Sequence, residues 1–287
     1  MSIVGIIGGS GLYELEGIKV QERLKLNTPF GEPSDEYILG SLEGRKVVFL
    51  SRHGAGHRIS PGEINYRANI YGMKKLKVEH LISVSAVGSL KEEIKPLDIV
   101  LADQFVDRTN QARKYTFFEK GIVAHIGFGD PVCPVLRKLL FQAAGETGAS
   151  VHQKGTYLNM EGPAFSTRAE SFLYRSWGMD IIGMTNMAEA RLAREAEMCF
   201  ATVALVTDYD CWFDKTDAFE VSAGLVMENM RKNIDRAKKI LIKTIPRIKG
   251  ERSCDCAAAL KDAIVTDKKL IPSRTKQDLE IIIGKYL

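Results

Sequence analysis

A run of ten residues that ends in two carboxylates is the feature that most constrains this chain. The run, 201–210, reads ATVALVTDYD. Its apolar and β-branched part, 202–207, is typical of a strand that is buried on both faces of a sheet. Asp208 and Asp210 follow at the carboxyl end of that strand, which is where α/β sheets bind ligands. The run therefore predicts an α/β fold with a ligand site at this strand end, against the alternative that the two aspartates only form a turn before a helix.

Other predicted strands also end in residues that can bind an anion. The run at 3–7 leads into a glycine turn, Gly8-Gly9-Ser10-Gly11, of the kind that holds phosphate at a helix start, although it fits no dinucleotide or Walker pattern. A strand at 46–51 runs into an arginine and a histidine, and the guanidinium is suited to forked contact with phosphate. The residues at these strand ends are Ser10, Arg52, His53, Ser85, Ala86, Met184 and Thr185. Together they predict one anion site. Taken one at a time, each of these short segments could equally be an ordinary turn or a pair of surface residues.

Composition excludes several classes of protein. The net charge of +4 is spread over 287 residues without a basic block, which argues against nucleic acid as a partner. No segment approaches the roughly 18 apolar residues of a membrane span, and the N-terminus lacks the pattern of a signal peptide, so the expected compartment is the cytoplasm. The five cysteines and five histidines are scattered without zinc spacing, and we therefore expect no metal and no organic cofactor.

The anion-binding strand ends and the strand end with two carboxylates together suggest one kind of ligand. An oxyanion site at one end and a pair of carboxylates at the other would suit phosphate and a nitrogen heterocycle, because carboxylates accept from amino groups and, when protonated, donate to ring nitrogens. With a sugar between them, this is the plan of a nucleoside phosphorylase.

Nine segments together resemble the trimeric-type purine nucleoside phosphorylase family, in its methylthioadenosine-cleaving branch, and they cover roughly residues 3–245 in order. These segments are 6–12 (IIGGSGL), 28–35 (TPFGEPSD), 52–54 (RHG), 65–70 (NYRANI), 86–94 (AVGSLKEEI), 103–109 (DQFVDRT), 161–171 (EGPAFSTRAES), 184–185 (MT) and 207–212 (TDYDCW).

The resemblance implies a single α/β domain whose mixed, distorted-barrel β-sheet is flanked by helices. Residues 1–250 are expected to form the nucleoside phosphorylase domain, with residues 251–287 as a C-terminal helical extension packed on the same domain. The implied assembly is a homotrimer or a homohexamer built as a dimer of trimers. The implied partners are a nucleoside and inorganic phosphate, which is a co-substrate.

The resemblance also assigns roles to individual residues. It implies that phosphate is bound by Ser10, Arg52, His53, Ser85, Ala86 and Thr185. It places Met184 against the ribose, and the purine against Asp208 and Asp210. These two aspartates and His53 are the implied catalytic residues. His125 corresponds to a histidine lent to the neighbouring subunit, while Ser166 and Val221 fall where base and 5′-substituent preference is set.

The reaction so implied is phosphorolysis of S-methyl-5′-thioadenosine to adenine and 5-methylthioribose 1-phosphate. Family members that act on 6-oxopurines usually carry asparagine in place of Asp208, so aspartate predicts a 6-aminopurine. The alternative is a 6-oxopurine nucleoside or methylthioinosine phosphorylase, and two further possibilities are a hydrolase that uses water and a nucleoside-binding module without turnover.

The cysteines carry one more implication of the resemblance. Cys254-Asp255-Cys256 is similar to a Cys-x-Cys motif of thermophilic relatives that contain disulfides, with Cys133 and Cys199 as candidates for a second pair. Reduced structural thiols are the alternative, because disulfides are unusual in the cytosol outside such organisms.

Overall fold

The computed structural model describes residues 2–9, 12, 17–110, 113–213 and 223–287. Two of the predicted site residues, Ser10 and Val221, lie outside these described residues.

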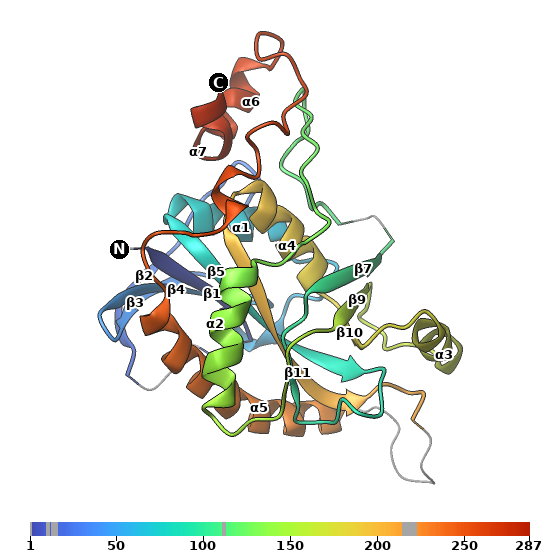
Figure 1. Ribbon diagram of the computed structural model, residues 1–287. Coiled ribbons are helices and arrows are strands. Elements are labelled where there is room, and N and C mark those ends of the chain that lie inside the picture. Colours follow the sequence, from blue (N-terminus) through green and yellow to red (C-terminus); the bar gives the residue numbers. More distant parts are fainter. Residues whose placement is uncertain (1, 10–11, 13–16, 111–112, 214–222) are drawn as a thin grey trace.

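In the described part of the chain, eleven strands form one mixed sheet, which crosses the middle of the molecule (Figure 1). The strands are β1 (Ile3–Gly8), β2 (Lys19–Leu24), β3 (Tyr37–Leu42), β4 (Arg45–Ser51), β5 (Val78–Ser89), β6 (Ile99–Val100), β7 (Gln104–Arg108), β8 (Val151–His152), β9 (Thr156–Met160), β10 (Ile181–Gly183) and β11 (Cys199–Tyr209).

The long strand β5 is the centre of this sheet. It pairs in parallel with β1 along its first half and with β11 along nearly its whole length, from His80 opposite Cys199 to Ser89 opposite Tyr209. The end of β5 pairs antiparallel with β10, which continues to β9 and β7. Because β1, β4, β5 and β11 are mutually parallel along the path β4-β1-β5-β11, their carboxyl ends lie at one edge of the sheet.

The sheet is mixed but open. Its main path runs from β2 to β7, and no strand pairing among the described residues joins these two ends into a barrel. The predicted α/β class, with a mixed sheet flanked by helices, is therefore confirmed, whereas hydrogen bonds do not close the sheet.

Helices cover both faces of the sheet (Figure 1). They are α1 (Tyr66–Lys75), α2 (Pro134–Gly145), α3 (Arg168–Ser176), α4 (Asn186–Glu195), α5 (Ala223–Thr244), α6 (Ser273–Asp278) and α7 (Glu280–Ile283). Alternate residues of the central strands enter two different cores, as the two-residue period of a strand requires. On β5, for example, Ile82 packs in the core with α2 and α5, while Leu81 packs in the core with α1 and α4.

The C-terminal segment 251–287 contacts the loop before α2. Ile264 bridges to Ala124 in an antiparallel pair, and the His125 N–H donates to the Ala263 carbonyl over 2.8 Å. Leu260 and Ile283 are buried in the same core as α1 and α4. Figure 1 shows this segment standing beside the loop at one end of the molecule. The division of the chain at residue 250 stays a prediction.

No helix among the described residues is long and apolar enough to cross a membrane.

Candidate active site

The two carboxylates lie side by side at the end of β11. The register of β11 against β5 shifts between Val206 and Asp208, which leaves Asp208 opposite Gly88. A β-bulge of this kind re-aims the side chains that follow it. A Cβ atom at Gly88 would lie 3.1 Å from Asp208 Oδ1 and 3.5 Å from Asp210 Cβ. The absence of a side chain at Gly88 therefore leaves the space in which both aspartates stand.

Asp208 is a buried carboxyl group with an unusually high pKa. Only 6% of the residue is exposed, and Oδ2 accepts a hydrogen bond of 2.6 Å from the Thr207 hydroxyl. Burial raises the pKa of Asp208 to about 6; the Thr207 hydroxyl opposes this rise, and the nearby Asp210 adds to it. Asp208 can therefore carry a proton close to neutral pH, as a general acid must.

Asp210 offers a buried acceptor. Its backbone N–H donates to the Ser89 carbonyl over 3.0 Å, but its Oδ2 is buried and has no hydrogen-bond partner among the described residues. Burial raises its pKa, and the neighbouring Ser171 and Ser166 hydroxyls lower it. An unsatisfied buried oxygen is costly, and a donor from a bound molecule would satisfy it.

Ser166 belongs to this carboxylate end of the site. Its Oγ lies 3.7 Å from Met160 Sδ, and its carbonyl accepts a hydrogen bond of 3.2 Å from the Cys211 thiol. The Ser166 hydroxyl is also close enough to Asp210 to lower the pKa of that carboxyl, and its predicted role in base and 5′-substituent preference stays a prediction.

Arg52 is buried at the opposite end of the site in an ion pair with Glu189. Its Nε and Nη2 lie 2.5 and 3.1 Å from the two Glu189 carboxylate oxygens, Nη2 donates to Ser83 Oγ over 2.7 Å, and Nη1 donates to the Val84 carbonyl over 3.0 Å. The guanidinium has five N–H groups. Among the described residues these bonds leave one N–H of Nη1 for another acceptor. The fork that we predicted for phosphate is therefore occupied by Glu189.

Glu189 also organises the neighbouring polar groups. Its Oε2 accepts from Ser83 Oγ over 2.6 Å and from Asn186 Nδ2 over 3.3 Å. Ser85 Oγ is 3.4 Å from Asn186 Oδ1, and Thr185 is the N-cap of α4 directly before Asn186. One hydrogen-bonded network therefore joins Arg52 and Ser85, two of the predicted phosphate residues, and Thr185 precedes its member Asn186 in the chain.

Sequence reasoning did not assign Glu189 or Asn186 to this site. Glu189 stands in the first turn of α4, where a carboxylate has a sufficient local explanation in the helix dipole. Its partner Arg52 is 137 positions away in the chain, and no local pattern connects them. The only available signal in the sequence was an acidic residue four positions after Thr185, where a strand was predicted to end.

The His53 imidazole has one nitrogen, Nε2, that can accept a hydrogen bond. Its Nδ1 lies 2.8 Å from the Ile59 carbonyl, which can only accept, so Nδ1 carries the hydrogen. Its ring stacks on His57 with centroids 4.2 Å apart. Burial, with a smaller contribution from Arg52, lowers the pKa of His53 to about 4. At neutral pH, Nε2 is therefore a hydrogen-bond acceptor.

Met184 directly precedes Thr185 and packs against Gly162. A Cβ atom at Gly162 would come 2.5 Å from Met184 Sδ, so the thioether packs directly on this glycine. The Met184 carbonyl accepts from Arg113 Nη1 over 2.5 Å, which holds the backbone in place. The side chain stays partly exposed, as a surface for a sugar requires.

Strand β5 connects the two ends of the site. Its Ser85 contacts Asn186 in the Arg52 network, and its Gly88 lies beside both aspartates. Three residues of extended chain span about 10 Å, which is close to the length of a nucleoside. Ser85, Asp208 and Asp210 thus lie along the carboxyl end of one strand pair, and their roles in binding stay predictions.

Among the described residues, His125 is the predicted site residue that lies apart from the others. It is exposed, and its loop pairs with the C-terminal segment rather than with β5. Within one chain the structure does not bring it to the site. Its predicted role is in a neighbouring subunit's site and stays a prediction.

Comparison with known proteins defines the class. The model of the phosphorylase superfamily matches residues 3–246, which places the chain in that superfamily. The S-methyl-5′-thioadenosine phosphorylase of Geobacter sulfurreducens is 57% identical over 285 residues, covering 99% of both chains.

Solved structures of methylthioadenosine phosphorylases share this fold. A methylthioadenosine phosphorylase from an antarctic soil metagenomic library superposes with a TM-score of 0.92 at 47% identity, covering 98% of each chain. The Schistosoma mansoni methylthioadenosine phosphorylase in complex with adenine gives 0.84 at 36% identity, covering 91% of this chain and 96% of that one. The chain belongs to the S-methyl-5′-thioadenosine phosphorylase family.

Proposed function

We propose that the protein catalyses the phosphorolysis of S-methyl-5′-thioadenosine to adenine and 5-methylthioribose 1-phosphate, a purine and methionine salvage reaction. The substrate assignment rests on the two buried carboxylates beside Gly88. Asp208 has a pKa of about 6, and Asp210 has an oxygen with no hydrogen-bond partner in the described part of the chain. A protonated carboxyl can donate to purine N7, and a carboxylate can accept from the 6-amino group. A 6-oxopurine would instead place a carbonyl oxygen against these acceptors.

In the proposed reaction, a phosphate oxygen attacks C1′ while the bond from C1′ to the purine nitrogen breaks. Positive charge develops on the sugar, and the nearby phosphate anion stabilises it. Asp208 delivers its proton to N7, so the base leaves neutral. Met184 packs on the ribose, and the Ser85 hydroxyl, the Ala86 and Thr185 region and the remaining Arg52 N–H hold phosphate.

The geometry of His53 defines its part in this scheme. Since Nε2 is an acceptor, it can receive a hydrogen bond from a hydroxyl of hydrogen phosphate. That contact would orient the phosphate with its unprotonated oxygens toward C1′. Ser10 belongs to the proposed phosphate set, and Ser166 and Val221 to the proposed specificity set. No cofactor takes part in the proposed reaction.

We further propose a homotrimer or a dimer of trimers located in the cytoplasm, in which His125 completes a neighbour's 5′ pocket.

An assay of four nucleosides, each with and without phosphate, tests the function. We expect adenine to be released from methylthioadenosine only when phosphate is present, and adenosine, inosine and methylthioinosine to react more slowly. Release without phosphate would identify a hydrolase instead. Binding of methylthioadenosine without any release would identify a nucleoside-binding module, and preference for methylthioinosine would favour the 6-oxopurine alternative.

The raised pKa of Asp208 predicts the pH dependence. The protonated form is the proposed donor, and its fraction falls as pH rises above about 6. At saturating phosphate, kcat/KM for methylthioadenosine should therefore decrease toward a limit of about tenfold per pH unit above that pKa. His53 does not titrate in this range, because its pKa is about 4. A rate that is flat or rises between pH 6 and 8 would contradict the assignment of Asp208 as the acid.

A further inference from the structure

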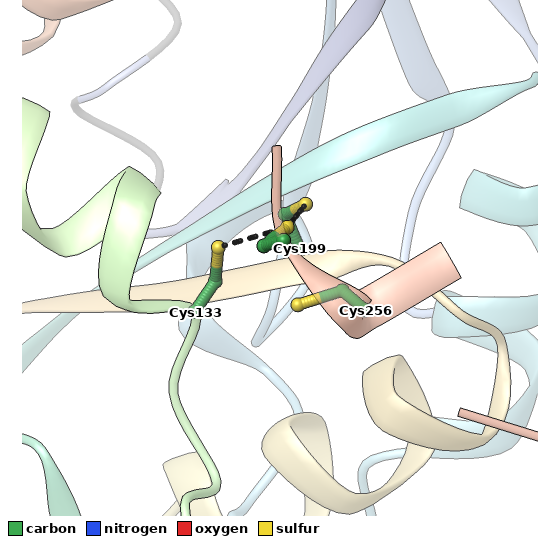
Figure 2. A group of neighbouring side chains, drawn as sticks. Cys133, Cys199 and Cys256 are labelled. Atoms are coloured by element: carbon green, nitrogen blue, oxygen red, sulfur yellow. Dashed lines mark hydrogen bonds between the residues drawn. The ribbon is translucent and has the colours of Figure 1, made fainter. Parts of the chain in front are cut away.

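Four of the five cysteines meet at one point that lies away from the candidate active site. Cys133 precedes α2, Cys199 begins β11, and Cys254 and Cys256 come from the C-terminal segment. Their four sulfur atoms all lie within 4.8 Å of one another, with 3.3 Å between Cys199 and Cys254 and 3.6 Å between Cys133 and Cys254. Figure 2 shows the side chains of Cys133, Cys199 and Cys256 pointing toward one another.

These separations match a common centre better than they match two pairs. A zinc ion with sulfur ligands at about 2.3 Å in a tetrahedron has sulfur–sulfur distances of about 3.8 Å. Every thiol here is near every other thiol, so the arrangement singles out no disulfide pairing, and all five cysteines are free. We propose that Cys133, Cys199, Cys254 and Cys256 form a closed structural site that binds one zinc ion.

The surroundings favour thiolates, and three of the four sulfur-bearing side chains are buried while Cys254 is half-buried. Cys133 and Cys199 are 1% exposed and Cys256 is 5% exposed. Cys133 is the N-cap of α2, and its sulfur accepts from the Leu136 N–H over 3.5 Å, so the positive end of the helix faces the sulfur. Four ligands without an open position are typical of structural rather than catalytic zinc.

His80 supplies a further group next to the sulfurs. It stands on β5 directly opposite Cys199, and its Nδ1 is buried without a hydrogen-bond partner among the described residues. Cys133 is close enough to act on its charge. An N–H donor beside a metal ligand is the usual support around a zinc site, and His80 is placed to give it.

The site would attach the C-terminal segment to the sheet. Cys254 and Cys256 join that segment to β11 and to the start of α2. Cys199 and Asp208 lie at opposite ends of β11, about 30 Å apart along the strand, so the ion would contribute to stability and not to the reaction. The sequence predicted no metal because the ligands come from three segments, and the Cys-x-Cys pair is shorter than the usual Cys-x₂₋₄-Cys spacing.

Metal analysis of the full-length protein tests this proposal. The protein is produced in zinc-supplemented medium, purified with reductant, and analysed by mass spectrometry for metals and by thiol titration. We expect about one zinc per chain in the native protein, and at least a tenfold loss in Cys199→Ser and Cys256→Ser. Cys211→Ser is the matched control, since Cys211 lies outside the cluster, and it should keep its zinc.

Two measurements on the native protein keep the test decisive if the variants fail to fold. Titration with a mercurial reagent should release zinc as the four cluster thiols react. A strong chelator should lower Tm by more than about 5 °C, because zinc binding contributes to folding. Native protein without zinc, whether its thiols are free or oxidised to disulfides, would overturn the proposal. So would zinc retained in both cluster variants, and iron in its place would overturn the choice of ion.

Discussion

Asp208→Asn is expected to lower kcat/KM for methylthioadenosine by about 10² to 10⁴-fold, the range that a general acid contributes. Asparagine keeps the shape of the side chain and can still occupy the space beside Gly88, but its amide cannot deliver a proton to N7. The same amide can donate to the O6 carbonyl of a 6-oxopurine. We therefore expect the ratio of kcat/KM values to shift toward methylthioinosine.

The exposed Asp235 on α5 provides the matched control, because Asp235→Asn makes the same chemical change at a solvent-exposed carboxylate. Its kinetic constants should equal those of the unaltered protein. The pH dependence described above should also be absent from Asp208→Asn. If the Asp208 variant retains its preference for the 6-aminopurine, Asp208 does not select the base.

Glu189→Ala is expected to have the largest effect on folding. It would leave the guanidinium of Arg52 buried, at 2% exposure, without its counter-charge. Removing one partner of a buried pair costs about 3–5 kcal/mol. The free energy of unfolding, measured by denaturant titration at fixed protein concentration, should fall by that amount. The KM for phosphate should rise, because Arg52 and Asn186 lose the carboxylate that positions them.

A double variant separates stability from activity here. Replacing a buried ion pair by apolar residues is often neutral for folding, so Arg52→Leu/Glu189→Leu should recover much of the lost stability without recovering phosphorolysis. Glu228→Ala breaks an exposed pair with Lys232 on α5 and should leave the unfolding midpoint unchanged. An unaltered midpoint in Glu189→Ala would show that this pair does not hold the phosphate end of the site together.

The sequence pointed to these site residues because polar residues follow several predicted strands. Asp208 and Ser85 each follow an apolar run, and parallel neighbouring strands bring such ends to one sheet edge. The roles of individual groups were less accessible. Arg52 and His53 were predicted to bind phosphate, and the sequence did not indicate that Glu189 would pair with the guanidinium or that the Ile59 carbonyl would fix the imidazole tautomer. Both partners are ordinary residues in their local sequence, so only their place in space identifies them.

The amino-acid sequence by itself determined the α/β class, the buried strand 202–207, the carboxylates that follow it and the family resemblance, because these depend on local periodicity and on motifs. The tertiary structure decided the open sheet, the Arg52–Glu189 pair and the convergence of four cysteines. Each of these joins segments far apart in the chain, and the packing of helices on the sheet, which no local pattern encodes, sets which distant side chains share a buried space.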